Sequence, residues 1–439
     1  MFSSARYLIS CALLLTLMLC NSPAHAGWSW SFPFYWTDSG PAVSAPSAAA
    51  EESQRPEKDS SSQPPKVSAT EASPALKLEV KPAETVLPSI QKPPLPPRAL
   101  SVFSPAQKLG STILDEDTRW SGSIQIDGMV TVSPQATLTI MPGSVIRFAA
   151  NSGLLVYGRI ALKGTPESPL LISSLYDEPR PSDWSGIFLI GTEKNNTFDH
   201  SVIQGADTAI QASFSAFEAN GILIDNSDTA LKLGNATVTV RNSVISSSTT
   251  GILAVKSEVD LESVTIDRNG SALTLQSSSL AAVKVRLRNN SHTALVADKS
   301  QLKLDRMLFS FNLNGLKTTE CDGSIVNSRF ISNRETAAIL TASSLKFSDN
   351  HVSGSRVGVQ LDDNNPTLWR NSISGNSSYN LLYLGDERYF AGGNWLGQNL
   401  PENQEAQMFS RQPGALLTAP LLAVDPYPPV GSDSAKAAD

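Results

Sequence analysis

Two adjacent carboxylates are the side chains of this sequence best suited by type and spacing to acid–base chemistry. Asp362 and Asp363 follow a short apolar stretch in "LDDNN". A carboxylate pair can share a proton or bind a cation. The corresponding stretches one and two repeats earlier, "LTASS" and "LKTTE", contain no matching aspartate, and an Asp-Asn corner turn explains the pair without chemistry. Asp362 and Asp363 are therefore candidate catalytic residues only of an enzymatic alternative, with Arg334 or Arg356 as the basic partner.

The other side chains that could react are scattered. His200, His292 and His351 fall at different positions relative to the apolar pattern, whereas metal ligands must converge on one point. No Gly-x-Ser-x-Gly motif indicates a serine hydrolase. Cys321 is the only cysteine after residue 26, so no disulfide framework is expected. The sequence predicts no metal and no cofactor, and it favours a non-catalytic protein while leaving enzymatic activity open.

A basic segment suggests binding instead of catalysis. In "VKVRLR" the alternation of a strand places the apolar residues inward and Lys284, Arg286 and Arg288 outward together. Arg306 joins them one repeat later. Four cations on adjacent strands would attract an anionic polymer, such as a uronic-acid polysaccharide or a lipopolysaccharide core. Asp267, one repeat before Arg288, would neutralise part of this charge, and a simple solvated face remains the alternative.

A repeat of about 21 residues must position these side chains. Within each repeat, apolar residues alternate with polar ones in pieces too short for a helix, separated by Asn, Ser, Gly and Asp. Three apolar columns predict three short strands per coil, each stacked on its copy in the next coil at about 4.8 Å. The first column is Ile210, Leu231, Ile252, Leu273, Leu295, Leu316, Ile339, Val359 and Leu381. The second is Ile224, Ile245, Ile266, Leu287, Phe309, Ile331, Val352 and Ile373. The third is Val238, Val259, Leu280, Leu302 and, after one skipped coil, Leu345.

A polar column follows the second apolar one. We interpret its residues as corner residues that accept the left-handed conformation and hydrogen-bond from coil to coil. They are Ser248, Asn269, Asn290, Asn312, Asn333, Ser355 and Asn376.

The chain resembles the right-handed parallel β-helix repeat proteins with the pectate-lyase-like superfamily fold. Besides the repeats, "VTVSPQATLTIMPGSVIRF" (130–148), "WSGI" (184–187) and "GGNWLG" (392–397) carry the resemblance, which covers roughly residues 118–425. It implies an all-β, single-stranded right-handed parallel β-helix solenoid with three short strands per coil. We expect residues 110–130 and 386–425 to cap its ends. The fold carries lyases, hydrolases, epimerases, adhesins and scaffolds, and the catalytic motifs "GHG" and "RIK" do not follow the aspartate pair.

The regions outside the repeats predict export and tethering. Residues 1–26 read as a signal peptide, so the mature chain would have no transmembrane segment and would be periplasmic, cell-surface or extracellular. Residues 27–40 are rich in aromatics that could dock to a partner. Residues 41–110 are predicted to be a disordered Pro/Ser/Ala-rich linker, 111–425 the β-helix domain and 426–439 a disordered tail. The candidate docking residues are Trp28, Trp30, Phe32, Phe34 and Trp36.

Three functions follow as hypotheses. The leading one is a non-catalytic exported β-helix protein that binds polysaccharide or another envelope component through an extended sheet face. The alternatives are a lyase, epimerase or hydrolase acting on a uronic-acid polymer, and a structural or assembly protein that docks through its aromatic N-terminus. The net charge of -7, with acids and bases interspersed, argues against nucleic acid. Ligand identity and oligomeric state stay open.

Overall fold

The computed structural model describes residues 98–363, 366–397 and 407–427. All of them belong to Gln91–Asp439, one of the two units into which the chain divides. Their regular elements are all strands, which confirms the predicted all-β class. Within these ranges no helix is long and apolar enough to cross a membrane. The predicted signal peptide, the aromatic segment from Trp28 to Trp36, most of the predicted linker and residues 428–439 lie outside the described residues.

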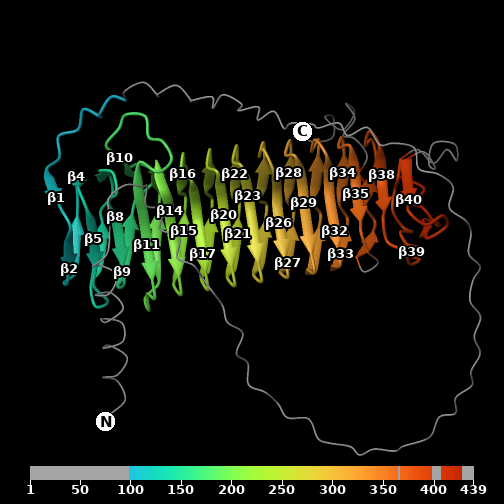
Figure 1. The fold of residues 1–439 in the computed structure, drawn as a ribbon, viewed down its shortest axis with the longest axis horizontal. Helices are drawn as coiled ribbons and strands as arrows, with labels where there is room; N and C mark the ends of the chain where they lie inside the picture. Colours follow the sequence, from blue (N-terminus) through green and yellow to red (C-terminus); the bar gives the residue numbers. More distant parts are fainter. Residues whose placement is uncertain (1–97, 364–365, 398–406, 428–439) are drawn as a thin grey trace, which may run out of the picture. The chain divides into compact units, whose positions relative to one another are not determined.

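The strands form three long parallel sheets, one strand of each per coil (Figure 1). Sheet 1 has 13 strands, from β1 (Gln107–Leu109) to β37 (Ser372–Ile373). Sheet 2 has 14, from β2 (Thr112–Leu114) to β40 (Met408–Ser410), and sheet 3 has 12, from β3 (Thr118–Trp120) to β36 (Thr367–Trp369). Each strand pairs with the strand three positions later in the chain. The chain therefore passes through all three sheets before it stacks on itself.

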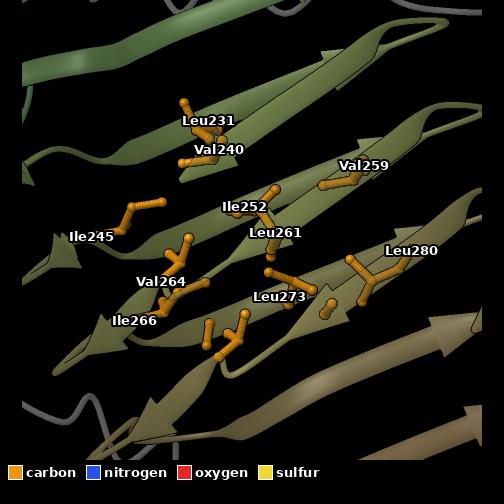
Figure 2. Packing of buried hydrophobic residues seen from close by; sticks show 14 of the residues in the cluster. Leu231, Val240, Ile245, Ile252, Val259, Leu261, Val264, Ile266, Leu273 and Leu280 are labelled. Carbon is orange, nitrogen blue, oxygen red and sulfur yellow. The ribbon is translucent and has the colours of Figure 1, made fainter. Parts of the chain in front are cut away.

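One coil illustrates the rule. It contains β22 (Thr265–Asp267), β23 (Ser271–Gln276) and β24 (Ser279–Val283), and β25 (Arg286–Arg288) begins the next. The predicted columns pair in register, with Ile266 opposite Leu287, Leu273 opposite Leu295, and Leu280 opposite Leu302. Figure 2 shows such residues pointing into one shared interior. The predicted three-strand coil is therefore confirmed.

Two members of the predicted columns are wrong. Ala338, and not Ile339, pairs with Leu316, and Phe330, and not Ile331, pairs with Phe309. Ile339 and Ile331 instead lie half-buried on the outer surface. A branched apolar residue directly follows the inward one in both cases, so hydrophobicity alone selects the wrong neighbour. The Phe330 ring stacks on Phe309 with 4.4 Å between ring centroids, which the true register explains.

The coil that the third column skips contains Gly323 opposite Leu302. Its φ is 123°, and an added Cβ would lie 1.9 Å from the Leu302 carbonyl oxygen. Only glycine fits this position. The apolar residue is thus absent from this coil because the backbone requires glycine there, and the stacking of the coils is unbroken.

Most corners contain one left-handed residue, such as Arg268 (φ 53°) or Asn289 (φ 55°). The next residue turns its side chain inward, and the backbone N–H of Asn269 donates to Oδ1 of Asn290, 3.0 Å away. Asn290 repeats the bond to Asn312. The predicted bonding from coil to coil is confirmed. The left-handed conformation was assigned to the wrong residue, because the buried amide needs ordinary φ to reach its neighbour while the preceding residue makes the turn.

The two ends differ from the prediction to different degrees. Residues 110–130 do not form a separate cap, since they form strands of the first two coils, up to the start of β5 (Met129–Val132). The linker boundary at residue 110 is also wrong, because β1 and the Arg98–Asp183 ion pair (2.5 Å) already belong to the solenoid unit. At the other end, β39 (Tyr389–Phe390) and β41 (Leu416–Leu417) form a separate two-stranded sheet.

Candidate functional site

The outer surface of sheet 1 from β25 to β31 (Arg329–Ile331) carries a group of cations that we call the basic face. In these three-residue strands the middle residue points inward and the first and third point outward. The corners at both edges of the sheet add further cations. The basic face comprises Lys284, Arg286, Arg288, Arg306, Arg329 and Arg334, all exposed.

Two of these arginines are free and aligned. Arg286 pairs in register with Leu308, and Leu308 with Arg329, so the two arginines lie two coils apart, about 10 Å at the usual strand spacing. Neither forms an ion pair with any described residue. Leu308, half-buried in β28 (Leu308–Ser310), lies between them. This part of the sheet therefore offers two positive charges, without ion-pair partners among the described residues, separated by one half-buried leucine.

The other two arginines predicted for binding are paired with carboxylates. Arg288 Nε lies 3.2 Å from Asp267, as expected from their spacing. Asp267 is buried and also contacts Arg268 at 2.5 Å. Arg306 Nε lies 2.8 Å from Asp305. The solvent-accessible Arg306–Asp305 pair contributes little to stability, whereas Asp267 is buried. Both pairs reduce the charge available to a ligand.

Lys284 does not lie on the same strand as Arg286 and Arg288. It is the left-handed corner residue (φ 55°) between β24 and β25, and Val283 before it ends β24 with its side chain half-exposed on the outer surface. The alternation restarts after a corner, so strand periodicity does not extend across "VKVRLR". Arg306 (φ 52°) occupies the same corner one coil later. The four predicted cations thus divide into two on β25 and two at this corner.

The opposite corner of sheet 1 carries two residues that the strand pattern of the sequence does not assign to a binding surface. Phe311 follows β28 with 58% of its surface exposed. Arg334 Nη2 donates to the Ser291 carbonyl 3.3 Å away, two coils back, so its side chain crosses the intervening coil at this corner. A bulky aromatic where other coils have mainly Asn, Ser or Gly was the available signal.

The structure does not bring together the acid and the base of the enzymatic alternative. Asp362 follows β35 (Val357–Leu361) and accepts hydrogen bonds from Thr341 Oγ1 and Gln360 Nε2, both at 2.7 Å. Arg356 immediately precedes the same strand and pairs with Glu335 at 2.6 Å. A five-residue strand spans about 16 Å, so acid and base lie at opposite edges of sheet 2. Asp363 is exposed, and Arg334 lies on the Arg356 side.

The packing and hydrogen bonds of Cys321 and His351 explain these residues without catalysis. Cys321 is buried, its Sγ donates to the Thr319 carbonyl at 3.2 Å, and burial raises the pKa of its thiol. It replaces a serine in a ladder formed by residues such as Ser300 and Ser343. His351 lies next to Arg329 in register, and burial, together with the Arg329 charge, lowers its pKa. Among the described ranges, no cluster of three or more His, Cys, Asp or Glu could hold a metal ion.

Comparison with known proteins identifies the fold. The family model for the right-handed β-helix region matches residues 180–385, and the model for the pectate-lyase-like β-helix domain matches residues 111–228. The solenoid is a right-handed parallel β-helix. No curated protein matches the sequence of this β-helix.

Two solved structures are similar at low identity. A periplasmic alginate epimerase matches with 10% identity and a TM-score of 0.32, over 62% of this chain and 76% of that one. The enzymatically active domain of bacteriophage CBA120 tailspike protein 2 matches with 11% identity and a TM-score of 0.35, over 60% of this chain and 43% of that one.

Proposed function

We propose that this β-helix binds a carboxylated polysaccharide along the outer surface of sheet 1, without catalysing its cleavage. The observation that carries the proposal is the pair Arg286 and Arg329, exposed, without a carboxylate partner among the described residues, and in register two coils apart. Guanidinium groups bind carboxylates in a bidentate manner, and two of them fix the position of a polymer better than one. Lys284, which forms no ion pair within the described ranges, adds a third positive charge at the edge of the sheet.

Apolar surface between the charges supports a sugar polymer over a simple anion. Leu308 lies between the two arginines. Ile331 lies two coils after Arg288, in register with it through Ser310. Sugar rings present C–H groups as well as carboxylates, so they gain from contact with both kinds of side chain. A small inorganic anion would gain nothing from the apolar patch.

Binding is favoured over catalysis by the placement of the candidate acid and base. Asp362 already accepts two hydrogen bonds, and Arg356 is paired with Glu335 at the far end of β35. General acid–base catalysis requires both groups within hydrogen-bonding reach of one substrate. In line with the predicted signal peptide, we place this binding in the periplasm, on the cell surface or outside the cell.

The test measures the affinity of the full chain for a uronic-acid oligosaccharide and for the same oligosaccharide with its carboxyl groups reduced to alcohols. Calorimetry at two salt concentrations is suitable. We expect binding of the uronate only, weakening as salt rises because the contacts are ionic. Equal affinity for the reduced oligosaccharide, or no binding of either, would refute the proposal.

A further inference from the structure

Phe311 adopts a conformation that its side chain disfavours. It is the corner residue between β28 and β29 (Asn314–Thr319), with a φ of 58°. The left-handed region strains a bulky residue, and Gly or Asn occupies it at far lower cost. The same corner in the other coils is formed mainly by small or polar residues, namely Asn226, Ser247, Arg268, Asn289, Ser332, Gly354 and Gly375.

Folding does not explain this phenylalanine. Its surface is 58% exposed, so the ring contributes little burial to offset the backbone strain. The next residue, Asn312, supplies the buried ladder amide, and the Phe311 N–H donates to the Ile331 carbonyl at 3.3 Å. Any residue in this conformation would make that backbone bond. Backbone strain that is not offset by burial or by hydrogen bonds of the side chain is a reason to look for function.

The surroundings of Phe311 match a sugar ring. The coil before that of Phe311 contains Arg288 and Asn289, and the coil after it contains Ile331. The Arg334 side chain crosses the same corner to reach Ser291. Aromatic surface next to guanidinium groups can contact the C–H face of a pyranose while the cations bind its carboxylate. Leu308, the outward residue of the same strand, continues the apolar surface toward the free arginines.

We propose that Phe311 is a stacking residue for one pyranose ring of the anionic polysaccharide, and that it selects sugars with a flat, unsubstituted C–H face. This inference rests on the proposed function. The backbone strain holds the ring outward at the edge of the basic face, where a small corner residue would leave nothing to stack on. Stability is thereby given up for binding, as at other sites where function conflicts with folding.

Phe214 provides a matched control. It is also a left-handed corner phenylalanine (φ 50°) and 59% exposed. It follows β14 (Ala206–Ser213), at the corner between sheet 2 and sheet 3, and so lies off the basic face. Replacing it removes the same strain and the same exposed ring.

The experiment compares Phe311→Asn, Phe214→Asn and Phe311→Tyr with the unmodified chain. We expect both asparagine variants to unfold at higher urea concentration, because asparagine tolerates the corner conformation. The affinity for a uronic-acid hexasaccharide should fall roughly ten-fold in Phe311→Asn only. Phe311→Tyr, which keeps the ring, should bind like the unmodified chain.

The possible results separate this inference from the proposed function. If the unmodified chain binds the hexasaccharide and Phe311→Asn binds it equally well, the stacking role is wrong while the basic face survives. If the unmodified chain does not bind, both proposals fail. Equal losses in Phe311→Asn and Phe214→Asn would likewise overturn a specific role for Phe311.

Discussion

Sheet 1 has two regions with the same backbone and different outer surfaces. From β7 (Val145–Phe148) to β19 (Val244–Ser246), the first outward column is entirely apolar, and from β25 to β31 it contains two arginines around one leucine. The inward column stays apolar in both. The apolar outward column is Val145, Leu171, Val202, Leu223 and Val244. Stacking therefore constrains the inner side of a coil, while the outer side is free to vary with function.

The chain itself covers part of the first region. Arg98 forms a bidentate pair with Asp183 and lies 3.8 Å from the ring centroid of Tyr176. Arg147 donates to the Ser174 carbonyl at 2.8 Å beneath Phe103, and burial lowers the pKa of this arginine. The described chain places no such segment on the free arginines of the basic face. One region of the sheet serves folding and the other presents charge.

The largest expected effect tests whether the interiors of the two regions are equivalent. Ile224→Ala in β16 (Leu223–Asp225) and Leu287→Ala in β25 each remove a fully buried side chain. Each should lower the free energy of unfolding by about 2–5 kcal/mol, because the stacked coils can collapse only partly around the cavity. Urea titration measures both. A cost near zero at one position would show that the interior is not uniform.

A smaller effect should distinguish the coil-to-coil hydrogen bonds of the corner residues in the two regions. Asn290, after β25, makes four side-chain hydrogen bonds to Asn269, Ile266 and Asn312. The buried Ser227 Oγ, after β16, has no hydrogen-bond partner in the described part of the chain. Asn290→Ala should cost about 1–3 kcal/mol of unfolding free energy, since buried donors and acceptors lose their partners. Ser227→Ala should be close to neutral. Equal costs in the same titration would contradict this account of the ladder.

The smallest expected effect uses His351 as a sensor of the basic face. Arg329 lies beside it in register and lowers its pKa, whereas Asp425 raises it. Arg329→Gln should therefore raise the pKa of His351 toward 6.5, measured by NMR titration of the imidazole protons. No change would mean that Arg329 does not point along this surface.

The same shift has a consequence for stability. Because the pKa of His351 is lower in the folded chain than in the unfolded chain, the unfolded chain takes up more protons between the two values. Stability present above about pH 6.5 is lost as the pH falls through the folded value. Arg329→Gln should reduce that loss.

The sequence was sufficient for the fold because coil-to-coil stacking repeats the same chemical requirement at each turn. Leu273 and Leu295 share one environment, so their spacing reveals it. The basic face was only partly predictable. Pairing of Arg288 with Asp267 followed from spacing, but the corner position of Lys284 did not, because one left-handed residue resets the alternation. Phe311 was missed because its apolar type suggests the interior, although its place in the corner column indicates exposure.

The central claim is most directly tested by removing the two free arginines together. Arg286→Ala with Arg329→Ala is compared with Lys303→Ala and Lys346→Ala, which remove the same charge from sheet 3, also two coils apart in register and exposed. Calorimetry with the uronic-acid hexasaccharide should show at least a roughly ten-fold loss of affinity for the arginine pair and almost none for the lysine pair. Equal affinities for the two variants would contradict the assignment of the binding surface.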